Sequence, residues 1–272
     1  MQLTSEQLKV LQQTELEIFK EFVSVCETLG IRYYLLAGTL LGAVRHQGFI
    51  PWDDDIDVGI LREDYERFLA QAGKLLPSHL FLQTYKTDKG YHQPFAKIRN
   101  SNTAFIELSV KDNPMNHGVF IDIFPLDRCN LEVRKSFAYR LKERIYSMRA
   151  SSLMRNYKLD AKRRLIRAVC MLICPSAHKA VEKLDKLHRS MPDGKMLVNF
   201  SGVYGEREIA PAEWYGAGVK IEFEGITVTV PKEYDKLLRQ IYGDYMTPPP
   251  PEKRVTTHQT CIIDTERSYT TY

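Results

Sequence analysis

Four aspartates fall within five residues in the segment Trp52-Asp53-Asp54-Asp55-Ile56-Asp57-Val58. In a β-strand, Asp55 and Asp57 project from one face, whereas Ile56 and Val58 project from the opposite, buried face. Two ionised carboxylates at this separation repel each other unless a cation neutralises them. The segment therefore predicts a strand with an apolar core face and an acidic face that suits a metal ion.

Two other interpretations of this acidic run are a solvated turn and a calcium loop. A plain acidic string is most often a solvated turn, but the alternation with apolar residues argues against a flexible loop here. The calcium loop of an EF-hand would place Asp53, Asp55 and Asp57 at its first three ligand positions. It would then place Val58 where glycine is required and Asp64 where glutamate is required, so the EF-hand interpretation fails.

A further aspartate, Asp122, lies within the apolar run from Val119 to Phe124. An acidic residue inside a buried strand is unfavourable unless it ligates a metal or is hydrogen-bonded. Asp55, Asp57 and Asp122 are therefore the predicted catalytic and metal-binding residues. Oxygen-only ligation favours Mg²⁺ or Mn²⁺, and two neighbouring strands could hold one or two such ions for phosphoryl transfer.

Gly38 and Thr39 are candidate phosphate-binding residues, because they lie between a predicted strand and a helix N-terminus, where backbone N–H groups attract anions. Arg45 and His46 end that short helix. They could contact phosphate or could cap the negative end of the helix, and the sequence leaves both possibilities open.

Lys97 and Arg99 alternate near the end of a predicted strand, so both side chains point to one side. Solvation is the default for such residues, although phosphate contact is a second possibility.

The patterns of apolar residues predict an α+β fold, with a mixed sheet, flanking helices, a basic helical insertion and a C-terminal hairpin–helix segment. The expected division is a core over 1–130, the insertion over 131–195 and a C-terminal segment over 196–272 that packs back on the core. Helices are expected over 4–29, 40–45, 63–76, much of 133–189 and 232–242. Strands are expected over 31–37, 55–61, 80–85, 93–98, 103–108, 119–124, 219–223 and 226–230.

Positive charge is concentrated in the insertion. Residues 134–167 hold twelve Lys/Arg and two acidic residues, a balance of +10, so the net charge of +4 leaves about −6 (4 − 10) for the remainder. An apolar stripe within 165–173 runs beside several of these cations, which fits either an interfacial amphipathic helix or an ordinary packed helix. Association of segment 134–173 with a membrane surface is therefore one expectation.

The sequence argues against several protein classes. No apolar run approaches the ~20 residues of a membrane-spanning helix, and no secretory signal is visible. The five cysteines are scattered without CxxC spacing, so neither a disulfide framework nor a zinc knuckle is indicated. A cytoplasmic protein, peripheral on the inner face of the membrane, is expected, and no specific nucleic-acid partner is expected because no RNA-binding motif is present.

The long segment from Leu36 to Asp57 resembles the signature of the LicD family. Residues 96–103 and 118–127 also resemble blocks of that family, as do 230–235, 242–246 and 248–250 near the C-terminus. LicD proteins are bacterial phosphocholine transferases of the nucleotidyltransferase-fold superfamily, distantly similar to fukutin-type ribitol-phosphate transferases. The region from 133 to 190 carries the least resemblance.

The resemblance implies that Gly38-Thr39 stands where the superfamily's Gly-Ser element holds nucleotide phosphates, with Thr keeping the hydroxyl. It also implies that Asp55 and Asp57 are the paired metal-binding acids and Asp122 the third. The implied reaction is Mg²⁺-dependent transfer of phosphocholine, or a related phospho-alcohol, from a CDP-choline-like donor to a sugar hydroxyl, with release of CMP. The acceptor would be a lipid-linked or other cell-surface glycan precursor, in teichoic acid or lipopolysaccharide modification.

Two other functions stay open at this stage. A true nucleotidyltransferase would attack the α-phosphate and release pyrophosphate instead of CMP. A non-catalytic module could bind an anionic polymer such as nucleic acid through its basic region, although the acidic cluster would then have no role.

Overall fold

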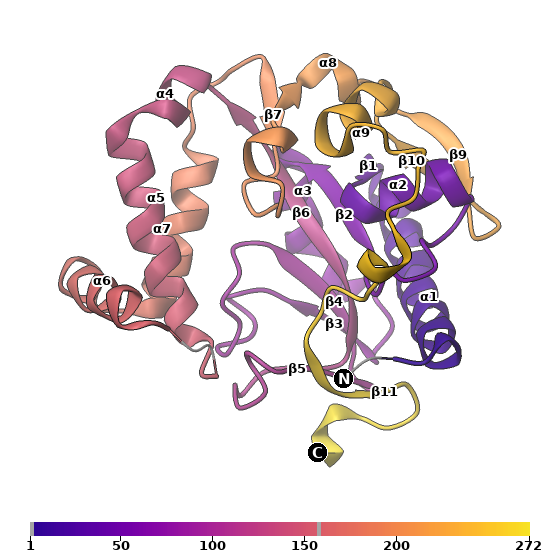
Figure 1. Ribbon diagram of the computed structural model, residues 1–272, viewed down its shortest axis with the longest axis horizontal. Helices are drawn as coiled ribbons and strands as arrows, with labels where there is room; N and C mark the ends of the chain where they lie inside the picture. Colours follow the sequence, from indigo (N-terminus) through magenta and orange to yellow (C-terminus); the bar gives the residue numbers. More distant parts are fainter. Residues whose placement is uncertain (1–2, 157–158) are drawn as a thin grey trace.

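Seven strands form one mixed sheet within residues 3–156 and 159–272, the part of the chain that the computed structural model describes (Figure 1). The sheet order is β1-β2-β6-β4-β3, with β7 pairing with β6 and β8 with β7. Strands β2 and β6 run parallel, and the other pairs run antiparallel. The predicted α+β fold with a mixed sheet is confirmed. The strands are β1 Tyr33–Leu35, β2 Asp57–Leu61, β3 Leu80–Gln83, β4 Ala96–Asn100, β6 Val119–Cys129, β7 Met196–Val198 and β8 Ala210–Pro211.

Helix α1 (Ser5–Leu29) has the ends that its sequence predicts. The Thr4 hydroxyl accepts the Gln7 N–H while the Gln7 side chain accepts the Thr4 N–H, which forms a capping box. Gly30 ends the helix at φ 62°, a left-handed conformation that glycine adopts without steric penalty. Local sequence alone therefore fixes both ends of this helix.

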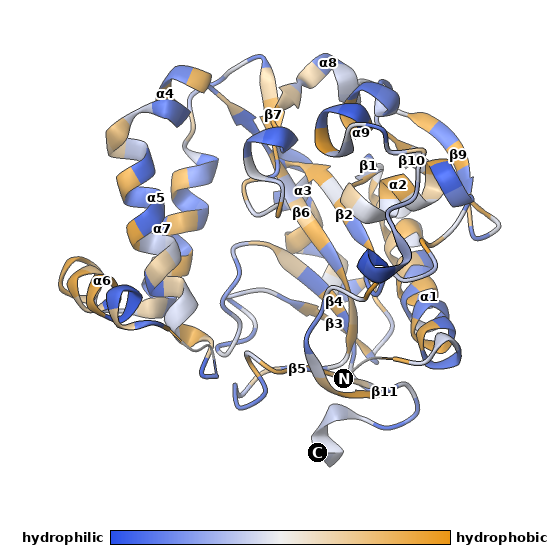
Figure 2. Cartoon of the chain, viewed as in Figure 1, coloured by the Kyte–Doolittle hydropathy of each residue, from blue (hydrophilic) through white to orange (hydrophobic). Residues whose placement is uncertain are grey.

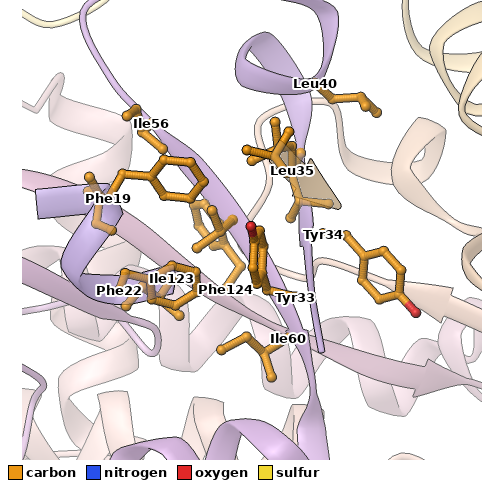
Figure 3. Packing of buried hydrophobic residues seen from close by; sticks show 14 of the residues in the cluster. Phe19, Phe22, Tyr33, Tyr34, Leu35, Leu40, Ile56, Ile60, Ile123 and Phe124 are labelled. Carbon is orange, nitrogen blue, oxygen red and sulfur yellow. The ribbon is translucent and has the colours of Figure 1, made fainter. Parts of the chain in front are cut away.

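Helices α1 and α3 (Arg62–Gln71) cover one face of the sheet. The Phe22 ring lies 5.3 Å from Tyr33 of β1 and 5.5 Å from Phe68 of α3, measured between ring centroids. Figure 3 shows Phe19, Phe22 and Tyr33 gathered above the residues of β2 and β6. The aromatic contacts join helix and sheet into one hydrophobic core.

The sheet register separates an apolar face from a charged one. Val58, Ile123 and Ala96 lie in one row across β2, β6 and β4, and all three are fully buried. The next row consists of Asp57, Asp122 and Lys97, whose side chains project from the opposite face. The period-2 alternation of β2 thus builds the core on one side and a charged site on the other, as expected.

Two element boundaries near the acidic segment differ from the prediction. Helix α2 (Ala37–His46) begins three residues earlier than expected, so Gly38 and Thr39 lie in its first turn. Strand β2 begins at Asp57 and not at Asp55, and the Asp57 N–H donates to the Thr39 hydroxyl at 2.8 Å. Asp55 therefore belongs to the loop that enters the strand.

Other expected elements differ mainly in length. Strands β1, β3 and β4 are shorter than predicted, whereas β6 extends five residues further, to Cys129. The expected helix over 63–76 is α3 followed by a 3₁₀ turn over Ala72–Lys74. The short strands β7 and β8, helix α8 (Ala212–Tyr215) and strand β11 (Thr260–Asp264) were not predicted, because each is only two to five residues long.

The basic insertion folds as a helical lobe on one side of the sheet (Figure 1). Residues 157 and 158 of the predicted basic segment lie outside the described residues. The division into three domains stays a prediction. The helices of the lobe are α4 Leu131–Lys135, α5 Phe137–Ala150, α6 Ala161–Ile173 and α7 Ala177–Arg189.

Arg62 joins this lobe to the sheet. Its guanidinium donates to both Asp127 carboxylate oxygens at 2.7 and 2.8 Å, and to Asp185 of α7 at 3.0 Å. The Tyr85 hydroxyl donates to the other Asp185 oxygen at 2.9 Å. One arginine therefore holds together α3, β6 and α7.

The C-terminal part contains the predicted hairpin and helix and then returns to the core. Strands β9 (Val219–Phe223) and β10 (Ile226–Val230) pair antiparallel, and α9 (Tyr234–Tyr242) follows. Beyond α9 the chain crosses the molecule until β11 pairs with β5 (Ala104–Glu107) (Figure 1).

Replacing Arg62 by Ala is expected to lower the free energy of unfolding by about 3–5 kcal/mol, because two buried carboxylates lose their shared cation. Urea denaturation measures this loss. The matched control is Arg239→Ala, whose ion pair with Asp235 is exposed and which should leave stability almost unchanged. Equal losses in the two variants would contradict the role assigned to Arg62.

Candidate active site

A cavity of about 390 Å³ opens on the charged face of the sheet. It is bounded by the first turn of α2, strands β2, β4 and β6, the loop around 199–204 and the C-terminal segment at 257–258. Six of the nine predicted site residues line it: Gly38, Asp55, Asp57, Lys97, Arg99 and Asp122.

Lys97 and Asp122 form a buried ion pair at the base of the cavity. Their Nζ and Oδ1 atoms are 2.6 Å apart, and the ammonium also lies over the Phe120 ring, 3.4 Å from its centroid. The default expectation that Lys97 and Arg99 are solvated is wrong, because β4 is an inner strand of the sheet.

Arg99 is committed largely to the fold. Its Nε donates to Gln83 at 2.6 Å and its Nη1 to the Gly118 carbonyl at 2.8 Å. Its Nη2 lies 3.9 Å from a carboxylate oxygen of Glu107 and makes no hydrogen bond to the described residues. Only this last nitrogen is left for a ligand in the cavity.

Three consecutive carboxylates form a cluster, and two of them, Asp53 and Asp55, line the cavity. One carboxylate oxygen from each of Asp53, Asp54 and Asp55 lies within 4.8 Å of the others. Asp53 was not among the predicted ligands, yet it lines the cavity beside Gly38. A Cβ atom at Gly38 would lie 2.6 Å from Asp53 Oδ2, so a larger residue there would displace the Asp53 carboxylate.

The aspartates on the cavity raise one another's proton affinity. Burial is the largest cause and neighbouring carboxylates add to it, so that the pKa of Asp55 rises to about 6. Burial and the charge on Asp55 likewise raise the pKa of Asp53 and of Asp57 well above its ordinary value. A cluster of oxygen ligands whose negative charge is incompletely compensated by the protein fits a hard divalent cation.

Asp54 belongs to this cluster and also holds the C-terminal segment. It accepts hydrogen bonds from the Thr257 N–H at 3.1 Å, the Thr257 hydroxyl at 2.9 Å and the His258 N–H at 3.2 Å. Although burial opposes this, hydrogen bonds from His258 and Thr257 lower the pKa of Asp54. Asp54 thus has a structural role, since it brings residues 257 and 258 to the cavity.

His258 supplies positive charge to this acidic site. Its Nδ1 lies 3.3 Å from Asp54 Oδ1, and its ring packs edge-on against Phe105 and Phe120. Burial alone would lower the pKa of His258, but Asp54, Asp55 and Glu107 raise it to about 9. Sequence analysis missed His258, because it lies about 200 residues from Asp54 and no local pattern marks it.

The remaining three predicted residues lie outside the cavity wall. The buried Thr39 hydroxyl accepts the Asp57 N–H, so it positions β2. Arg45 donates to the Tyr245 carbonyl at 2.7 Å and thereby ties α2 to the chain after α9. His46 packs edge-on against Trp52.

The sequence is similar to those of known proteins. A family model described as LicD/FKTN/FKRP, nucleotidyltransferase domain, matches residues 30–153, a range that contains every predicted site residue. The lipopolysaccharide cholinephosphotransferase LicD of Haemophilus influenzae is 30% identical over 262 residues, which cover 92% of this chain and 96% of that protein. The ribitol 5-phosphate transferases FKRP of Mus musculus and Homo sapiens are each 47% identical over 57 residues, 21% of this chain and 11% of those proteins.

Glu208 is a further carboxylate on the cavity, remote in sequence from the aspartates. It accepts the Tyr204 N–H at 2.9 Å and is almost fully buried. Burial raises the pKa of Glu208 from 4.5 to about 7. The pKa of Glu208 is therefore higher in the folded chain than in the unfolded chain. Its contribution to the free energy of unfolding is complete below pH 4.5 and is lost as the pH rises through 7.

We expect Glu208→Gln to be more stable than the wild type at pH 8 by up to about 3 kcal/mol, with the difference vanishing near pH 4.5. Thermal unfolding of both proteins between pH 4.5 and pH 8 measures this divergence. Glu252→Gln, at an exposed position, is the control and should follow the wild type throughout. A constant offset for Glu208→Gln at every pH would show that its carboxyl does not titrate differently on folding.

Proposed function

The chain belongs to the LicD family, and on that premise we propose that it transfers phosphocholine, or a related phospho-alcohol, from a CDP-activated donor to a sugar hydroxyl. The acceptor would be a lipid-linked or other precursor of a cell-surface glycan, such as lipopolysaccharide or teichoic acid. One observation carries the proposal: an acidic row, a buried lysine and a helix N-terminus meet in one cavity.

The reaction joins the acceptor oxygen to the phosphorus of the phospho-alcohol. The bond from that phosphorus to the bridging oxygen of the diphosphate breaks, and the electron pair leaves with CMP. The proton of the sugar hydroxyl passes to a base. The products are a phosphodiester on the glycan and CMP, so no oxidant or further co-substrate is needed.

The cavity residues fit a metal ion held mainly by carboxylates. Asp55, Asp57 and Asp122 are the proposed ligands, and the geometry adds Asp53 as a neighbour of Asp55. When bound, Mg²⁺ or Mn²⁺ would neutralise the diphosphate and stabilise the departing CMP. Asp122 could instead accept the proton of the acceptor hydroxyl while Lys97 holds its carboxylate in place.

The start of α2 is the proposed phosphate site. The N–H groups of its first turn, which includes Gly38 and Thr39, have no capping side chain among the described residues. Ala37 adopts φ 44°, which is unfavourable for a residue other than glycine, and such strain is typical of functional sites. Lys97 and Arg99 Nη2 would add positive charge on the opposite wall.

Two other functions are weaker. Release of pyrophosphate in place of CMP would indicate a true nucleotidyltransferase that acts at the α-phosphate. A non-catalytic module that binds nucleic acid through the helical lobe would leave the carboxylate cavity without a purpose. Strongly salt-dependent binding to arbitrary DNA would favour that second alternative.

We expect Asp55→Asn and Asp57→Asn each to reduce CMP release from CDP-choline in the presence of Mg²⁺ by at least about 100-fold. Neither variant should melt below the wild type in a metal chelator, because removing one carboxylate relieves repulsion within the cluster. High-performance liquid chromatography of nucleotides and thermal unfolding provide the two measurements.

Asp193→Asn is the matched control, because the Asp193 side chain is 90% exposed and lies off the cavity. It should keep wild-type activity. Wild-type CMP release from Asp55→Asn would overturn the metal assignment, and pyrophosphate as the wild-type product would overturn the proposed reaction.

Helix α6 supports a location at a membrane surface. No helix of the described residues has the length and apolar character to span a bilayer. Leu165, Val169 and Leu172 lie on one side of α6 and are 69%, 52% and 82% exposed. Figure 2 shows hydrophobic and strongly hydrophilic residues together on α6 at the edge of the molecule. An ordinary packed helix would bury such a stripe, so exposed apolar residues beside basic ones favour an anionic lipid surface.

We expect the wild type to co-sediment with phosphatidylglycerol-containing vesicles at low salt and Leu172→Glu to lose most of this binding. The substitution replaces an apolar contact with a charge that anionic lipid repels. The control is Leu75→Glu at an exposed position on the core, which should bind like the wild type. A wild type that stays in the supernatant with these vesicles would overturn the membrane proposal.

A further inference from the structure

A second cavity, also of about 390 Å³, adjoins the catalytic one and lies between the core and the helical lobe. The two cavities share His92, Gln93, Met154 and Ser201 in their linings, so they form one continuous depression. We call the second cavity the lobe groove. Its far wall consists of residues of α4, α5 and α7, from the region with the least resemblance to the LicD family.

One wall of the lobe groove is a fixed polar and aromatic surface. Arg134 donates to Glu143 at 2.8 Å, and the His188 Nε2 lies 3.5 Å from the other Glu143 oxygen. Phe200 stacks on the His188 ring with centroids 4.4 Å apart and planes at 16°. Because Glu143 offsets the charge of Arg134, this part of the wall does not resemble a site for a polyanion.

Other polar side chains around the groove are available to a ligand. Among residues 3–156 and 159–272, the side chains of Gln93, Arg144 and Ser147 line the groove and make no hydrogen bond. Amide, guanidinium and hydroxyl groups next to an aromatic ring are suited to a ligand rich in hydroxyl groups. A sugar has this chemistry.

His92 lies where the two cavities meet. Its Nδ1 atom is buried and has no hydrogen-bond partner among the described residues. Burial lowers the pKa of His92 to about 4, so the imidazole is neutral near pH 7 and could accept a hydrogen bond from a hydroxyl. His92 lines both cavities, so this unpartnered nitrogen belongs to a residue at their junction.

We propose that the lobe groove binds the sugar acceptor and directs one of its hydroxyls past His92 into the catalytic cavity. Naming the sugar as the acceptor rests on the proposed function, whereas sugar binding by the groove does not. Helix α6 packs on α5 of the same lobe, so a glycan attached to a membrane lipid could extend from the membrane surface along the groove to the catalytic cavity.

Saturation-transfer NMR tests this proposal without requiring turnover. The probes are glucose, galactose, N-acetylglucosamine, N-acetylgalactosamine and ribitol at millimolar concentration. At least one is expected to give a signal with the wild type. Ser147→Trp, which fills the groove from an exposed position of α5, should reduce that signal at least fivefold.

Ala138→Trp is the matched control on the same helix, since Ala138 is exposed and lies outside the groove. It should keep the wild-type signal. Arg144→Trp, on the groove wall, should repeat the loss, and this second variant decides the matter if Ser147→Trp melts early. Absence of a signal with every probe, or equal signals for the groove and control variants, would overturn the proposal.

A separate assay distinguishes failure of the groove from failure of the proposed function. CDP-choline hydrolysis without acceptor should be unchanged in Ser147→Trp, because the substitution lies outside the catalytic cavity. Groove-dependent sugar binding without CMP release by the wild type would overturn the proposed function and keep the sugar site. If the wild type releases CMP but no groove variant alters the sugar signals, the sugar site would be overturned and the proposed function would be kept.

Discussion

Repulsion between carboxylates on one face of the sheet is the constraint on which the rest of this structure depends. The parallel register of β2 and β6 sets Asp57 beside Asp122, and the antiparallel register of β4 sets Lys97 on the other side of Asp122. Lys97 and His258 offset part of the negative charge, yet the pKa of Asp55 still rises to about 6. A site with excess negative charge in a cavity is prepared for a cation and for the phosphate groups that a cation attracts.

The acidic segment also organises the chain far from itself. Asp54 does not join the charged row but accepts hydrogen bonds from Thr257 and His258, so the C-terminal segment closes one side of the cavity. Arg62 has the corresponding role on the other side, where it fixes α7 to the core. Both interactions connect residues more than 100 positions apart. One positions the C-terminal segment beside the cavity, and the other positions α7 against the core.

Sequence patterns predicted much of the fold because the decisive signals are local. The capping box and glycine define α1, and the alternation of apolar and acidic residues defines which face of β2 is buried. The prediction failed where tertiary contacts override local preference. Lys97 and Arg99 resemble surface residues, but β4 has a neighbour on each side, so both are buried. Arg45 and His46 lie at the end of α2 as expected. Their side chains contact Tyr245 and Trp52, however, and do not line the cavity.

The sequence by itself determined the α+β fold class and the two faces of β2, because these depend on residue spacing within single elements. Its resemblance to the LicD signature indicated the family. Only the tertiary structure decided that Asp53 lines the cavity, that Asp54 holds the C-terminal segment, and that His258 contributes positive charge. The reason is physical: which charges lie close together depends on how distant segments pack, and electrostatic energy depends on that distance and on burial. The lobe groove has the same origin, since α5, α7 and the core meet only in the folded chain.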